Sequence, residues 1–154
     1  MKLDESKIID IECDHIRTLE AKKITYRGLE IYAVKRSTDY SYAQCALFDI
    51  TNKAWWCGYV EVPLAMYSLF KPRGYPDEAI LDELDDPNNY DLVHVHGGYT
   101  YIDNGIPLVL NDSQRLFLGW DYNHWPDTED CVTYQEILKE GMKVVDSMQE
   151  FQTT

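Results

Sequence analysis

Residues 24–35 read Ile-Thr-Tyr-Arg-Gly-Leu-Glu-Ile-Tyr-Ala-Val-Lys, and this stretch decides the fold class. β-Branched and aromatic residues occur in both of its halves, which is typical of β-strands. Arg27-Gly28 interrupts them, and a glycine between two such runs favours a tight turn. The stretch therefore predicts two antiparallel strands joined as a hairpin.

A second hairpin is expected directly after the first. Residues 42–50 and 54–62 are rich in apolar and aromatic residues, and Thr-Asn-Lys separates them. Pro63 ends the second run, because proline has no N–H to donate to a neighbouring strand. Two further strands are predicted at residues 91–101 and 114–122, with turn residues between the apolar segments.

Helical spacing of apolar residues is found near both ends of the chain. Residues 133–151 have the clearest pattern and predict a C-terminal helix. Residues 4–22 also suit a helix, with a strand that begins near Ile8 as the alternative. Residues 64–89 combine a short apolar run with prolines and an acidic stretch, so we expect a surface excursion with one or two helical turns.

Hairpins that precede one strong helix, instead of alternating with helices, predict an α+β fold. We expect an antiparallel β-sheet built from hairpins with a C-terminal helix, in a single domain spanning residues 1–154. No apolar run approaches the ~20 residues of a membrane helix, and residues 1–7 lack the apolar stretch of a signal peptide. These features predict a cytoplasmic protein without a membrane partner.

The four cysteines are scattered and form no C-x-x-C pair. This spacing argues against a zinc ribbon and against a disulfide framework. Most of them are expected to be small buried residues, although one could still complete a metal site. The cysteines are Cys13, Cys45, Cys57 and Cys131.

Charge divides the chain into two unlike halves. Residues 1–73 hold 11 Lys/Arg and 10 Asp/Glu, whereas residues 74–154 hold 3 and 17, so the halves carry +1 and −14 and sum to −13. This charge argues against direct nucleic-acid binding, because phosphates would meet electrostatic repulsion. The acidity either maintains solubility or forms a surface that meets a basic groove on a partner.

Two histidines flank Val95 in the run Leu-Val-His-Val-His-Gly-Gly. On a strand, residues two apart share a face, so His94 and His96 would project together and could chelate one ion. The alternative is a hydrogen-bonded pair of histidines at a strand end.

A carboxylate and an imidazole follow about twenty-five residues later, where a strand is expected to run into a loop. Asp121 and His124 could supply the remaining positions of a tetrahedral site, with Asp127 as an outer anchor or substitute ligand. Imidazoles grouped with few acids fit zinc better than calcium or magnesium. The sequence thus predicts one zinc ion held by His94, His96, Asp121 and His124.

Three blocks resemble the motifs of a family of small proteins from bacteriophages and mobile elements. Residues 57–63 contain Gly-Tyr-Val, residues 94–101 read His-Val-His-Gly-Gly-Tyr-Thr-Tyr, and residues 119–124 fit Gly-aromatic-Asp-x-x-His. The likeness spans about half of the chain. Family members often have cysteine where Tyr122 stands and glycine where Pro126 stands, so a cysteine-containing metal site is not carried over.

The chain resembles a metal-containing anti-CRISPR protein of type II-A, which implies binding to the host type II RNA-guided nuclease in the host cytoplasm. In this hypothesis zinc organises the fold, and an acidic surface in residues 77–91 docks on the nuclease and hinders DNA loading. The residues assigned to that surface are Asp77, Glu78, Asp82, Glu83, Asp85 and Asp86.

Two other classes of function remain open from the sequence. A metal-dependent hydrolase would use a zinc-bound water, with Glu61 or Asp127 as general base. A structural or regulatory domain would use the metal only to stabilise its fold.

Overall fold

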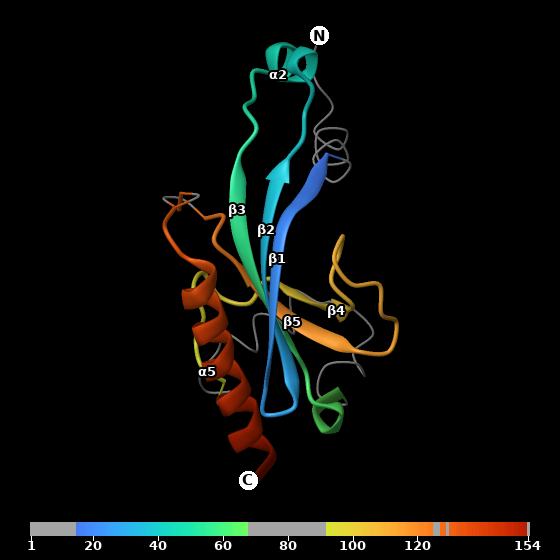
Figure 1. The fold of residues 1–154 in the computed structure, drawn as a ribbon, viewed down its shortest axis with the longest axis vertical. Coiled ribbons are helices and arrows are strands. Elements are labelled where there is room, and N and C mark those ends of the chain that lie inside the picture. Colours follow the sequence, from blue (N-terminus) through green and yellow to red (C-terminus); the bar gives the residue numbers. More distant parts are fainter. Residues whose placement is uncertain (1–14, 68–91, 125–126, 129, 154) are drawn as a thin grey trace.

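The structure is a computed structural model that describes residues 15–67, 92–124, 127–128 and 130–153 (Figure 1). Five strands form one antiparallel sheet in the order β1-β2-β3-β5-β4, accompanied by helices. This arrangement confirms the predicted α+β class. The elements are β1 (Ile16–Tyr26), β2 (Leu29–Thr38), α2 (Tyr42–Phe48), β3 (Ala54–Glu61), the 3₁₀ helix η1 (Leu64–Met66), β4 (Tyr101–Asn104), β5 (Leu116–Asp121) and α5 (Tyr134–Thr153).

The predicted first hairpin is confirmed and extends beyond residues 24–35. Tyr26 pairs with Leu29, and the two turn residues between them, Arg27 and Gly28, have φ angles of 50° and 83°. Two successive positive φ angles match the right-handed twist of the flanking strands. The ladder continues as far as Ile16, so the helix predicted over residues 4–22 is wrong from that residue onward. Residues 1–14 lie outside the described part of the chain.

The second predicted hairpin is half correct. Residues 54–61 form β3 as expected, but residues 42–48 form the helix α2 instead of a strand. Ser41 explains this, because its hydroxyl accepts a hydrogen bond from the Gln44 N–H while the Gln44 side chain accepts one from the Ser41 N–H. Such a reciprocal capping box starts helices. α2 connects β2 with β3 at the end of the sheet remote from the C-terminus (Figure 1).

The strand predicted over residues 91–101 is largely absent. Residues 92–100 are irregular, and only Tyr101 onward belongs to a strand, β4. Gly97 and Gly98 have φ angles of 70° and 81°, which a strand cannot contain.

The prediction at residues 114–122 is confirmed by β5. The excursion predicted over 64–89 begins with η1, and its remainder from residue 68 lies outside the described residues.

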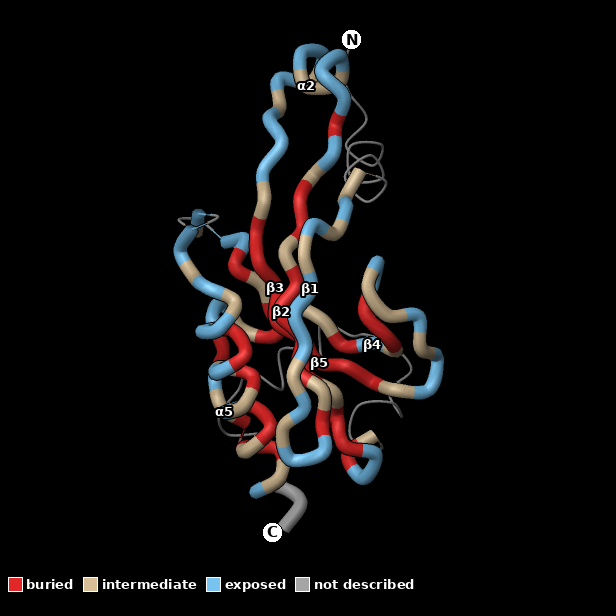
Figure 2. Tube along the Cα trace, in the orientation of Figure 1, coloured by how far each residue is buried: buried red, intermediate tan, exposed pale blue. Residues whose placement is uncertain are grey.

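The C-terminal helix is confirmed as α5, which packs against β1, β2 and β3 (Figures 1 and 2). A first core lies between this helix and the sheet. It contains the fully buried side chains of Ile31, Val60, Leu118, Ile137 and Val145. No helix in the described residues is both long enough and apolar enough to cross a membrane.

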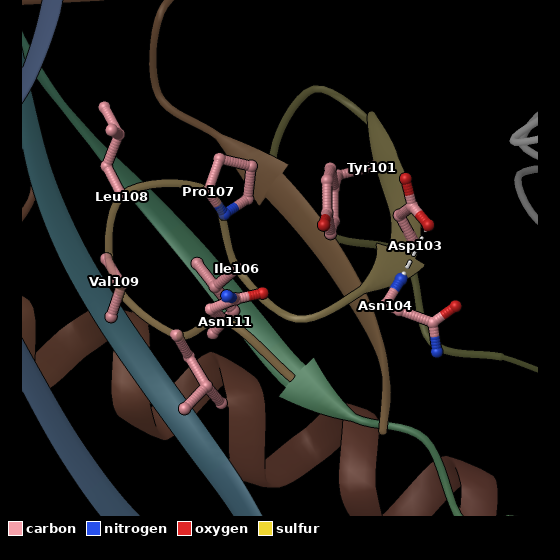
Figure 3. Close-up of a pocket in the computed structure, with 9 residues that line it drawn as sticks. Tyr101, Asp103, Asn104, Ile106, Pro107, Leu108, Val109 and Asn111 are labelled. Carbon is pink, nitrogen blue, oxygen red and sulfur yellow. Dashed lines mark hydrogen bonds between the residues drawn. The ribbon is translucent and has the colours of Figure 1, made fainter. Parts of the chain in front are cut away.

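A second, smaller core lies on the opposite face of the sheet. Tyr32, Val34, Cys57 and Phe117 contribute to it from β2, β3 and β5, and Ile106 closes over them from the segment after β4. That segment also borders an open pocket of about 520 Å³, whose walls are mostly apolar or amide side chains, with one carboxylate, on Asp103 (Figure 3). The sheet therefore has α5 on one face and an irregular segment on the other.

Candidate metal centre

Three of the predicted ligands are brought together at one end of the sheet. β5 ends at Asp121, and His124 follows after a short bend. His96 comes from the irregular segment 92–100, which lies beside β5 because the Thr100 N–H donates to the Gly119 carbonyl over 2.9 Å. Residues about twenty-five positions apart therefore meet through the β4–β5 pairing, and not along one strand.

Each imidazole at this end is paired with a carboxylate. His96 Nε2 lies 2.8 Å and 2.9 Å from the two oxygens of Asp127, and His124 Nε2 lies 3.2 Å from Asp121 Oδ1. The carboxylates are also held from elsewhere. Asp127 accepts the His124 N–H over 3.0 Å, and Asp121 accepts the Thr100 hydroxyl over 3.0 Å. Asp127 therefore links the two histidines and belongs to the cluster.

Burial alone would raise the pKa of Asp127. The hydrogen bonds from His96 and from the His124 N–H outweigh that effect, so the pKa of the carboxyl is lowered from its ordinary value. Asp127 is accordingly ionised at neutral pH. An ionised carboxylate beside two imidazoles is a donor set that suits zinc.

The turn beside the histidines requires glycine. A Cβ at Gly97 would lie 2.5 Å from His124 Cδ2, and the backbone there has a positive φ angle. The His124 ring thus lies directly against the backbone of the segment that carries His96. The ring centroids of the two histidines are 6.4 Å apart.

α5 supports this segment through Glu140. One oxygen of Glu140 accepts the His96 N–H over 2.9 Å, and the other accepts the hydroxyl of Tyr122. The Tyr122 ring stacks on His96 with a centroid separation of 4.6 Å, and burial together with Glu140 raises the pKa of the Tyr122 hydroxyl. Sequence reasoning missed both residues. Glu140 could have been found, because it is a carboxylate three residues after Ile137 on the buried side of a helix.

The fourth predicted ligand, His94, is exposed and takes part in none of the contacts described above. The sequence argument placed it beside His96 on one face of a strand, and that strand is absent. Cys131 is closer to the cluster, with its Sγ 4.0 Å from Asp127 Oδ1. Cys57 is buried inside the sheet, and burial raises the pKa of its thiol to about 11.

The arrangement approaches the geometry of a tetrahedral site without closing it. Two donor atoms bound to one tetrahedral zinc lie about 3.3 Å apart, close to the separations within each imidazole–carboxylate pair. Two imidazoles on one such ion would have centroids about 5 Å apart, less than the 6.4 Å between His96 and His124. Within the described ranges, no three His, Cys, Asp or Glu side chains are already grouped around one point for a metal.

Glu61, one of the two general bases considered for a hydrolase, lies at the other end of β3. It pairs with Phe117, whereas Asp121 pairs with Cys57 four residues earlier on the same strand. That offset corresponds to about 13 Å along a strand. The Glu61 carboxylate instead accepts the Glu30 N–H over 3.1 Å and lies 3.7 Å from Arg115.

The predicted acidic docking surface lies outside the described residues, since all six of its carboxylates fall in residues 77–86. Comparison of the chain with protein-family models, with curated proteins and with solved structures found no match in any of the three.

Proposed function

We propose that the protein binds one zinc ion through His96, Asp121, His124 and Asp127, with His94 as the further candidate ligand. The observation that carries this proposal is the convergence of two imidazole–carboxylate pairs from separate segments, linked by Asp127. A cation between the pairs would replace two partly exposed imidazole–carboxylate contacts by four metal bonds. Zinc would then fasten the segment 92–100 to the end of β5 and to Asp127, which precedes α5 in the chain.

We further propose that the zinc is structural and that the protein acts by binding another macromolecule. Its partner is the type II RNA-guided nuclease that the motif resemblance implies, and the bound protein hinders DNA loading. The −14 charge of residues 74–154 supports this proposal, because a nuclease that holds nucleic acid presents basic grooves. The position of Glu61 disfavours the hydrolase that would use it as general base.

A cleavage assay tests the proposed inhibition. A type II RNA-guided nuclease loaded with its guide is incubated with increasing amounts of the protein before target DNA is added. We expect cleavage to fall with increasing protein, and to fall much less when the protein is added after the DNA has bound. Undiminished cleavage at a large molar excess of protein would contradict the proposal.

Charge reversal then identifies the surface. Replacing Asp82, Glu83, Asp85 and Asp86 together by lysine should abolish the inhibition, because it places positive charges against a basic groove. A matched control has the same number of lysines at Asp39, Asp49, Asp103 and Asp130, which lie elsewhere in the chain. Equal loss of inhibition in both variants would mean that net charge, and not this surface, is responsible.

A further inference from the structure

Arg36 is a buried cation on the sheet face opposite α5. It is 5% exposed and donates three hydrogen bonds, from Nη1 to Thr18 Oγ1 over 3.3 Å and from Nη2 to the Tyr59 hydroxyl and the Pro107 carbonyl over 3.2 Å and 2.6 Å. Its guanidinium also lies 5.7 Å from the centre of the Tyr59 ring. All of these partners are neutral.

The charge of Arg36 therefore has no counter-charge in direct contact among the residues that the structure describes. Among the described residues, no carboxylate forms an ion pair with it. A guanidinium stays protonated even when buried, and burying a charge without a counter-charge is costly. A guanidinium also has five N–H donors, of which three are used here. An anion beside Arg36 would use the remaining donors and supply a counter-charge in direct contact.

A pocket of about 300 Å³ lies next to this guanidinium. Register places its walls on one face of the sheet, since Arg36 pairs with Trp55 and Cys57 pairs with Asp121. One part of the wall is aromatic and buried, and the other is polar and more exposed. The aromatic part comprises Trp55, Tyr59 and Tyr101, and the polar part comprises Thr100, Asp121 and Asn123.

These walls define the class of ligand. The pocket offers one cation and contains the carboxylate of Asp121, so it favours a monoanion over a phosphate dianion. A planar carboxylate matches the fork of a guanidinium, and aromatic walls pack best against a flat apolar body. We propose that this pocket binds a small aromatic carboxylate whose anionic group contacts Arg36.

The proposed ligand site is separate from the proposed zinc site. Asp121 borders both, but Arg36 and the aromatic wall make no contact with His96 or Asp127 among the described interactions. His96→Ala should therefore lose zinc and keep the carboxylate site. Failure of one proposal leaves the other testable.

Titration calorimetry with benzoate tests the site, with benzamide as a neutral probe of nearly the same shape. We expect saturable binding of one benzoate per chain and at least tenfold weaker binding of benzamide. Arg36→Gln should weaken benzoate binding at least tenfold. Lys35→Gln is the matched control, because it removes the same charge one residue away on the opposite face of β2, where Lys35 lies over Trp56, and it should bind benzoate like the wild type.

A nuclear magnetic resonance titration of the wild-type protein keeps the test valid if Arg36→Gln does not fold. Benzoate should shift the indole N–H signal of Trp55 and the amide signal of Asn123, and leave the indole signal of Trp56 in place. Equal binding of benzoate and benzamide, or shifts confined to other residues, would mean that Arg36 only joins neighbouring segments. Inorganic phosphate that binds as tightly as benzoate would overturn the assignment to carboxylates.

Discussion

Arg115 contacts more carboxylates than any other cation among the described residues. It is the only Lys or Arg between Gly74 and Leu138. Its Nε lies 2.7 Å from Asp112, and its Nη1 lies 2.9 Å from Glu30 and 3.7 Å from Glu61. One guanidinium beside the start of β5 thus contacts three carboxylates, which come from β2, β3 and the segment before β5.

Arg115→Gln should lower the free energy of unfolding by about 1–2 kcal/mol, because hydrogen bonds to charged groups are stronger than neutral ones but are partly exposed here. Urea denaturation at pH 7 measures the change. Arg17→Gln on the exposed side of β1 is the control and should change stability by less than about 0.5 kcal/mol. Equal effects of the two substitutions would show that only net charge matters.

The same comparison should depend on pH. Burial alone would raise the pKa of Glu30, but the hydrogen bonds from Tyr32 and Arg115 outweigh burial, so the pKa of Glu30 is lowered. Hydrogen bonds from Arg115 and from the Gln114 N–H lower the pKa of Asp112. The ordinary pKa values are 4.5 for Glu30 and 3.8 for Asp112. Because the pKa of each carboxyl is lower in the folded protein, its contribution to stability is fully present above its ordinary value and is lost as pH falls through its folded-state value. The difference between wild type and Arg115→Gln should therefore shrink as pH falls below about 4. A difference that stays constant from pH 7 to pH 3 would contradict this account.

At the scale of elements, the close contact of α5 with the sheet depends on a glycine. A Cβ at Gly141 would lie 2.4 Å from Ile31 Cγ2. Ile31 belongs to the first core, which lies between the helix and β2 and β3, and Gly141 is buried against it. Glycine is unfavourable inside a helix, so its presence here reflects the short distance between α5 and β2.

Gly141→Ala should destabilise the protein by about 1–3 kcal/mol, because overpacking outweighs the gain of about 1 kcal/mol in helix propensity. Thermal and urea unfolding measure this change. Ile31→Leu removes the Cγ2 methyl group, so the double variant should be less destabilised than the sum of the two single variants. Simple additivity would show that Gly141 and Ile31 do not conflict.

Elements were predictable where the local pattern and the packing agree. The first hairpin follows from the β-branched and aromatic residues on both sides of Arg27-Gly28, and α5 follows from residues 133–151, whose helical period matches the buried face of the helix. The strand prediction at residues 42–48 is wrong because their apolar content resembles a strand, whereas the capping box of Ser41 and Gln44 starts a helix there. Register across β3, β5 and β4 depends on contacts between distant residues, which no local pattern contains.

The candidate site was predictable only in part, because it also depends on contacts between residues that are distant in the sequence. His96, Asp121 and His124 were recognised from their residue types and spacing, and Asp127 was considered as an anchor. The partnership between His96 and Asp127, and the support from Tyr122 and Glu140, arise from packing of α5 beside an irregular segment. The expectation that His94 and His96 share a strand face had no such packing to support it.

At the scale of the whole molecule, the sheet is covered on both faces, and negative charge is concentrated in the second half of the chain. α5 covers one face, and the segment after β4 closes part of the other (Figure 1). Pro107 of that segment accepts a hydrogen bond from Arg36, which lines the smaller pocket. Most of the negative charge is in residues 74–154, which contribute β4, β5 and α5 to the fold. A binding function based on this charge should be sensitive to ionic strength.

Inhibition of a type II RNA-guided nuclease should therefore weaken as salt is raised. Increasing the salt from about 0.05 M to about 0.5 M shortens the screening length severalfold and should raise the protein concentration needed for half-inhibition at least tenfold. The cleavage rate of the nuclease without the protein, measured at each salt concentration, is the control. Inhibition that is independent of salt would show that an apolar surface mediates the contact.

Zinc content is the most direct test of the central claim. Plasma mass spectrometry of protein purified without an affinity tag should find about one zinc per chain in the wild type, as expected for a single tetrahedral site. His96→Ala and His124→Ala should lose it, whereas His15→Ala should retain it, because His15 contacts Gln44 and Tyr40 beside α2. Wild-type protein without zinc, or full zinc content in both His96→Ala and His124→Ala, would contradict the proposed metal centre.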